Sequence, residues 1–145
     1  MVSRIAHVSF TVSDLERSLS FYRDLLGFEL KAQVERSGPD VEGITGFPSA
    51  TLKIGFLTFD NLTLELIQYI SPIGGKLDLR TNNVGCAHIA FHVEDMEEVY
   101  NFLSAKGVRF KSKPNQIKEG LFAGGKAVYL YDPDGITLEL LQLKS

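Results

Sequence analysis

The sequence is poor in the features that mark several classes of protein. It has a single cysteine, Cys86, which excludes an internal disulfide and favours a reducing compartment. It has no long run of lysine or arginine, and its formal net charge of -3 indicates neither nucleic acid nor an anionic membrane as a partner. Its apolar stretches are shorter than the roughly 20 residues of a membrane span, and its N-terminus does not resemble a signal peptide. We therefore expect a cytoplasmic protein.

Two internal repeats organise the chain. IAHVSFTVSD at 5–14 matches CAHIAFHVED at 86–95 in five of ten positions, and DNLTLELIQY at 60–69 matches DGITLELLQL at 134–143 in six of ten. The strings recur in the same order, so the chain contains two copies of one module. With 145 residues, 44% of them hydrophobic, it has material for one core. We expect a single domain over 1–145, with module 1 at about 1–70, a linker at about 71–84 and module 2 at about 85–145.

Each module is predicted to be β-α-β-β-β. In the first helix the apolar positions recur every three or four residues: Leu15, Leu19, Tyr22 and Leu26. Ser13 and Glu16 form a capping box at its start, and Gly27 ends it. The second helix repeats the plan at Met96, Val99, Leu103 and Gly107. Strands are predicted at 28–35, 50–59 and 62–69, and at 108–112, 126–131 and 136–143. The irregular stretch 111–125 is long enough to be a binding loop.

Alternation along the strands places the repeated polar residues opposite the apolar ones. His7 and His88 each lie across the strand from apolar neighbours, and so do Glu65 and Glu139. A carboxylate buried in a sheet needs a strong partner, and a divalent metal ion is one. Two imidazoles and two carboxylates suit nickel, cobalt, manganese, zinc or iron, with open positions for a substrate.

Two simpler interpretations compete with the metal site. A single histidine on a strand is more often hydrogen-bonded in a core than bound to a metal. A repeated glutamate could point outward from an edge strand, where alternation is ordinary. The occurrence of two histidines and two glutamates at matched positions of the repeat favours the metal.

At these residues the chain resembles the vicinal oxygen chelate superfamily. This superfamily includes glyoxalase I, methylmalonyl-CoA epimerase, extradiol dioxygenases, fosfomycin-resistance proteins and bleomycin-binding proteins. The resemblance covers nearly the whole chain, through IAHVSFTVSDLERSLSFYRDLLGFEL, AHIAFHVEDMEEVYNFLSAKGV and YLYDPDGITLELLQL. It implies an α+β fold in which two tandem βαβββ modules form curved mixed sheets around a metal-binding cleft.

The resemblance also implies a set of site residues and a reaction. The metal ligands fall on His7, Glu65, His88 and Glu139, which is similar to the glyoxalase I pattern. The implied enzyme is a lyase or isomerase, like lactoylglutathione lyase or methylmalonyl-CoA epimerase. It removes a proton next to a carbonyl and stabilises the resulting enediolate on the metal, with Glu139, or less readily Glu65, as the base. The alternatives are an iron-dependent extradiol dioxygenase and a non-catalytic drug-binding resistance protein.

Further contacts to a small-molecule substrate are expected at the edges of the site. His92 lies on the face of His88 about 13 Å farther along, too far for the same metal. Thr11 and Lys126 are additional candidates, and the substrate is expected to be a thiol adduct or a CoA thioester. Sheet edges without a neighbouring strand predict a homodimer. The resemblance implies the same, because similar members of the superfamily commonly form dimers.

Overall fold

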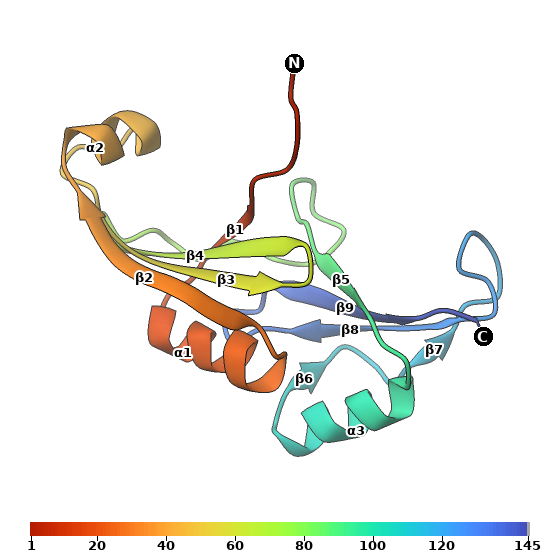
Figure 1. Ribbon diagram of the computed structural model, residues 1–145. Coiled ribbons are helices and arrows are strands. Elements are labelled where there is room, and N and C mark those ends of the chain that lie inside the picture. The colour runs from red at the N-terminus through yellow and green to blue at the C-terminus, as the bar shows by residue number, and fades with distance from the viewer. Residues whose placement is uncertain (145) are drawn as a thin grey trace. The chain divides into compact units, whose positions relative to one another are not determined.

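The structure, a computed structural model, describes residues 1–144 of the chain. The chain divides into two units between Lys76 and Leu77, within the stretch expected to be a linker. Each unit contains one mixed β-sheet and its own helices (Figure 1). None of the helices within residues 1–144 has the length and apolar character needed to cross a membrane.

The first unit contains a four-stranded sheet in the order β1-β4-β3-β2. β1 is parallel to β4, whereas β4, β3 and β2 pair antiparallel. Its elements in chain order are β1 (Val8–Thr11), α1 (Leu15–Leu19), the π-helical turn η1 (Ser20–Leu25), β2 (Glu29–Ser37), α2 (Pro39–Thr45), β3 (Thr51–Phe59) and β4 (Leu62–Ser71).

The second unit repeats this topology. Its main strands lie in the order β5-β9-β8-β6, with β5 parallel to β9, and the short β7 also pairs with β8. Its elements are β5 (Ile89–His92), α3 (Met96–Ala105), β6 (Arg109–Phe110), β7 (Asn115–Gln116), β8 (Lys126–Tyr131) and β9 (Thr137–Gln142). The predicted α+β fold of two βαβββ-like modules with mixed sheets is therefore confirmed.

The repeated aspartates begin the helices. The carboxylate of Asp14 accepts the N–H of Arg17 at 3.1 Å, and that of Asp95 accepts the N–H of Glu98 at 3.0 Å. The predicted capping box at Ser13 is wrong, since its hydroxyl accepts a bond from the Arg17 guanidinium instead. Aspartate satisfies helix N–H groups as well as serine does. The N-cap of α1 is therefore Asp14, one residue after the predicted Ser13.

The repeated glutamines hold each helix to its own sheet. Oε1 of Gln68 on β4 accepts the N–H of Leu15 at 2.9 Å, and Oε1 of Gln142 on β9 accepts the N–H of Met96 at 2.9 Å. The acceptor in each case serves the first residue of the helix, whose N–H has no partner within the helix. The glutamine of each repeated string is therefore structural.

The leucines around each repeated glutamate form the core beneath the helix. Leu64 and Leu66 on β4 are fully buried, as are their counterparts on β9. Gly55 on β3 lets α1 approach closely, because a Cβ there would lie 3.0 Å from Cδ2 of Leu19. The glutamates, offset by one residue from these leucines, are thereby directed to the opposite face of the sheet.

The first helix widens before it ends. The N–H of Leu26 donates to the carbonyl of Phe21 at 3.3 Å, a five-residue spacing, and Tyr22 on this turn is fully buried. Gly27 follows with a φ of 81°, as its predicted role at the end of the helix requires.

The helix α2 was not predicted. It begins at Pro39 and is followed by Gly46 with a φ of 74°, a pairing of residues that is typical of short helices. Val41 of α2 packs on the sheet face opposite α1. The apolar cluster there consists of Val41, Ala50, Leu52 and Ile54, with Phe56, Ile67 and Tyr69 packed against it.

Candidate metal centre

The first histidine and glutamate of the repeat form a pair within unit 1. Nε2 of His7 lies 3.3 Å from Oε2 of Glu65. The register of β1 and β4 places Ser9 beside Glu65, so His7, two residues earlier, lies on the same face as the glutamate. The Glu65 side chain is 13% exposed and that of His7 is 44% exposed. The pair is therefore partly shielded and still accessible from one side.

The second pair has the same construction in unit 2. Nε2 of His88 lies 3.0 Å from Oε2 of Glu139, with exposures of 37% and 19%. Ala90 is the register partner of Glu139, as Ser9 is of its counterpart. The His88 ring also contacts the ring of Tyr129, at 5.2 Å between centroids. Tyr129 is the neighbour of Glu139 on the antiparallel strand β8.

The N···O separations fit two adjacent ligands of one metal ion. Ligand atoms about 2.1 Å from a metal and at right angles to each other lie about 3.0 Å apart. A simple hydrogen bond has the same length, so the repetition of the same two atoms at matched positions is what favours a metal. Within residues 1–144, no three His, Cys, Asp or Glu side chains come together. The donors are thus present as two pairs.

The structure places His92 and Thr11 on the faces that carry the pairs. His92, at the end of β5, is the register partner of Leu141, and its Nδ1 lies 3.7 Å from the carboxylate of Glu94. Thr11 is exposed at the end of β1 beside Ile67. Both positions agree with the predicted face, and their contacts to substrate stay predictions.

The structure does not bring Lys126 to the second pair. Its ammonium group donates to Oε1 of Glu97 on α3 at 3.1 Å. Its register partner is Gln142, whose side chain also contacts α3. Lys126 therefore lies on the helix side of the sheet, opposite Glu139, and no contact in the structure supports its predicted role in substrate binding.

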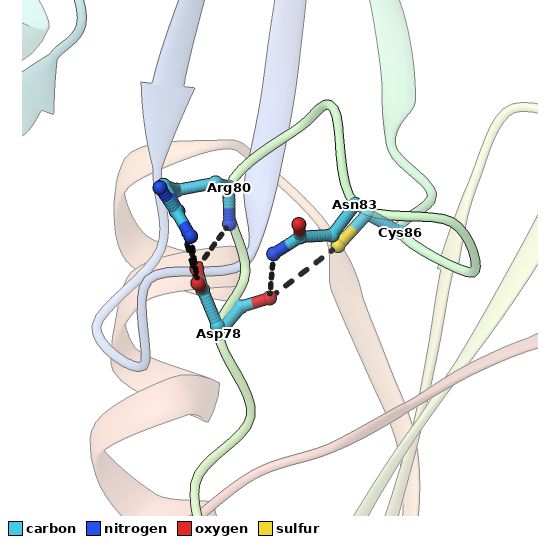
Figure 2. Close-up of polar contacts among 4 residues, drawn as sticks. All are labelled: Asp78, Arg80, Asn83 and Cys86. Carbon is cyan, nitrogen blue, oxygen red and sulfur yellow. Dashed lines mark hydrogen bonds and ion pairs between the residues drawn. The ribbon is translucent and has the colours of Figure 1, made fainter.

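A hydrogen-bonded loop leads into the second pair. Figure 2 shows the carboxylate of Asp78 bound to the Arg80 guanidinium, with a shortest N···O distance of 2.6 Å, while its main-chain carbonyl accepts from Asn83 Nδ2 at 3.0 Å. The thiol of Cys86 contacts the same carbonyl at 3.8 Å, two residues before His88. The bond to Arg80 holds the pKa of Asp78 below its ordinary value and raises that of the arginine. This loop is thus held together locally at the entrance to β5.

Sequence reasoning missed Tyr129, although a signal for it was present. The β8–β9 hairpin pairs Tyr131 with Thr137, and counting outward from it aligns Tyr129 with Glu139. The hairpin register therefore identifies the aromatic neighbour of the second pair.

Both units thus combine a βαβββ-like module with a histidine and a glutamate on the sheet face away from its first helix. Residues 4–140 match the family model described as the glyoxalase, bleomycin resistance protein and dioxygenase superfamily. The chain belongs to this superfamily.

Three relatives of known name match nearly the whole chain. It is 31% identical to 2-epi-5-epi-valiolone epimerase of an Actinomyces species, over 96% of this chain and 79% of that protein. It is 32% identical to ethylmalonyl-CoA/methylmalonyl-CoA epimerase of Cereibacter sphaeroides, over 99% and 100%. It is 28% identical to a probable lactoylglutathione lyase of a Synechocystis species, over 97% and 96%. These distant relatives are epimerases and lyases.

Solved structures support the fold and the chemistry of the family. A glyoxalase family protein from Bacillus cereus matches with a TM-score of 0.84 and 22% identity, over 100% of this chain and 97% of that one. The fosfomycin resistance protein FosX from Listeria monocytogenes, solved with Mn(II) and sulfate, matches with a TM-score of 0.63 and 25% identity, over 98% and 93%. Members of this family therefore bind divalent metals.

Proposed function

We propose that the protein is a metal-dependent isomerase of the epimerase type that removes a proton from the carbon next to a carbonyl. The observation that carries this proposal is the repetition of the histidine–glutamate pair, at 3.3 Å in one unit and 3.0 Å in the other. The epimerases described above match at 31% and 32% identity and the lactoylglutathione lyase at 28%, which favours epimerisation over the lyase reaction. A lyase reaction on a thiol adduct is the alternative within the same chemistry.

The residues that would hold the metal are His7, Glu65, His88 and Glu139. A centre with all four ligands needs the His7–Glu65 pair and the His88–Glu139 pair, either from the same chain or from two chains. A divalent ion bound there would supply Lewis-acid polarisation of the substrate carbonyl. Nickel, cobalt, zinc, manganese and iron all suit two nitrogen and two oxygen ligands.

One of the two glutamates, Glu139, has a second role in this proposal, as the base. Glu139 takes the proton from carbon and returns it to the other face or to a neighbouring atom. His88 stays in place because its ring packs against Tyr129. Glu65 is held on its own strand beside Phe56 and serves as a ligand. The division of labour between the two carboxylates follows the family resemblance and requires a direct test.

The test is deuterium exchange from solvent, catalysed by protein loaded with metal. Candidate substrates are methylmalonyl-CoA, the hemithioacetal of methylglyoxal and glutathione, and simple 2-hydroxy ketones. Exchange next to the carbonyl that depends on the metal is the expected result. Oxygen consumption with a catechol, or tight ligand binding with no exchange, would contradict the proposal and would instead support a dioxygenase or a drug-binding protein.

We also propose that the protein forms a homodimer. In the described part of the chain, β1 and β2 are the edges of the first sheet, and each leaves backbone groups without a strand neighbour. The bulge at Lys31 in β2 interrupts that edge, so β1 is the better candidate for contact with a second copy. Sedimentation at micromolar concentration should show a dimer, and a monomer would contradict this proposal.

A further inference from the structure

The sheet face that carries Glu139 has two cations at its outer edge. β6 is the outer strand in the order β5-β9-β8-β6, and Arg109 on β6 is the register partner of Tyr131 on β8. Two residues later, the N–H of Lys111 donates to the carbonyl of Tyr129 at 2.9 Å, so the same pairing continues. Tyr129 is in turn the partner of Glu139. The side chains of Arg109 and Lys111 therefore share the face of the glutamate.

The contact made by Arg109 agrees with this placement. Its Cζ lies 5.6 Å from the centroid of the Tyr131 ring, so the guanidinium lies over the sheet face and does not point away from the edge. A guanidinium over an aromatic face is attracted by the ring quadrupole. Two strand spacings, about 10 Å, separate the main chain of Lys111 from that of Glu139. One small molecule could therefore contact the second histidine–glutamate pair and both cations.

Arg109 differs from the other cations of the two sheets. Every other lysine or arginine within a strand of residues 1–144 is paired with a carboxylate: Lys31 with Glu29, Arg36 with Asp40, Lys53 with Glu35, and Lys126 with Glu97. In the same part of the chain, neither Arg109 nor Lys111 forms an ion pair with a carboxylate. Two positive charges without a carboxylate partner, beside the second pair, favour an anionic ligand.

The first unit has no such cations at the corresponding positions. The row of register partners that contains Glu65 ends on β2 at Ala32, and the next row on the same face ends at Glu29. Lys31, at the bulge between them, forms an ion pair with Glu29 at 2.7 Å. The histidine–glutamate pair is thus repeated in both units, whereas the unpaired cations belong to the second unit alone.

We propose, on the basis of the function proposed above, that Arg109 and Lys111 bind an anionic group of the substrate. The vicinal oxygens of the substrate lie at the His88–Glu139 pair, and its carboxylate or phosphate lies within about 10 Å of them, at the two cations. The substrate class is thus a carbonyl compound in which a chain of several atoms joins the reacting carbon to an oxyanion. Both contacts lie within the second unit.

Hydroxamates test this proposal because they bind metals through two vicinal oxygens and can carry a second group on a hydrocarbon chain. Protein loaded with cobalt is titrated calorimetrically with hydroxamates whose chains, over a series of lengths, end in a carboxamide, a carboxylate or a phosphonate. The carboxamide is the neutral counterpart of the carboxylate. An anionic end should tighten binding about fivefold at the best chain length, and added salt should reduce this gain. The anion with the larger gain identifies the group as a carboxylate or a phosphate.

Substitutions assign the gain to the two cations. Arg109→Gln and Lys111→Gln should each remove part of it, and together they should remove all of it, while the affinity for carboxamide ligands stays the same. Arg109→Lys keeps the charge and should keep part of the gain. Lys106→Gln is the matched control, because it removes a positive charge from the end of α3, where the lysine lies over the Phe102 ring. This control should change nothing.

The outcomes separate this proposal from the function on which it rests. If the protein holds metal and binds acetohydroxamate, but carboxylate and phosphonate ligands bind no better than carboxamides, the recognition of an anion fails alone. It also fails if the double variant keeps the gain, or if Lys106→Gln removes as much of it as Arg109→Gln does. If the protein holds no metal, both proposals fail.

Discussion

Replacing Glu139 with glutamine should stop proton transfer and leave the protein folded. The amide has the shape of the carboxylate, and its oxygen can still serve as a ligand. It cannot accept a proton from carbon at neutral pH, so the proposed base is lost with almost no change in side-chain volume. Loss of a general base typically lowers the rate by about 10² to 10⁴.

The surroundings of Glu139 limit the effect of this change on stability. Its side chain is 19% exposed, and the facing His88 is 37% exposed, so the pair is in contact with water. A partly exposed pair contributes at most about 1 kcal/mol to folding. Against a total stability of about 5–15 kcal/mol, that loss leaves nearly all molecules folded. Unfolding therefore cannot explain a hundredfold loss of rate.

The assay is deuterium incorporation next to the substrate carbonyl, with metal content and thermal unfolding measured on the same samples. Glu65→Gln should be milder, because Glu65 is proposed to act only as a ligand and an amide oxygen can still coordinate the ion. Glu98→Gln, on the exposed side of α3, is the control for the chemical change alone. Exchange by Glu139→Gln at the rate of the parent protein would refute the role of Glu139 as the base.

Three further predictions concern the framework around the site. Gln142→Leu leaves the N–H of Met96 without its acceptor and should lower the free energy of unfolding by about 1–3 kcal/mol; an unchanged denaturation midpoint would contradict this. Gly125→Ala places a Cβ 2.3 Å from the main-chain oxygen of Gln142 and should destabilise by about 1–3 kcal/mol, seen as a lower melting temperature. Arg80→Gln should return the pKa of Asp78 toward its ordinary value of 3.8, as measured by NMR titration. Because the folded pKa is the lower one, this bond contributes at neutral pH and is lost as the pH falls through that lowered pKa, so an unchanged titration would refute the pairing.

Much of the architecture could be predicted from local patterns in the sequence. Strand alternation is a local property, and it correctly separated Glu65 and Glu139 from the leucines on either side of them. Because the repeat covers the first strand, the helix and the last strand of each unit, each of these elements was predicted from two separate segments. The same reasoning placed each histidine on the face of its glutamate, and the structure pairs both.

The features that were missed depend on competition or on distant partners. Asp14 and Ser13 are adjacent and both are good N-cap residues, so the sequence pattern does not distinguish them; in the structure Asp14 caps the helix. The roles of Gln68 and Gln142 require knowing which helix lies over which strand, because each acceptor is far along the chain from its donor. The helix α2 is short and rich in glycine and proline, so its composition resembles a turn.

Metal content tests the central claim most directly. Protein purified without chelators should contain about one divalent ion per chain, by elemental analysis. A variant that combines Glu65→Ala with Glu139→Ala removes both proposed carboxylate ligands and should lose most of that metal. The control variant, Glu97→Ala with Glu98→Ala on α3, should keep it. Full occupancy in the first variant, or no metal in the parent protein, would contradict the account.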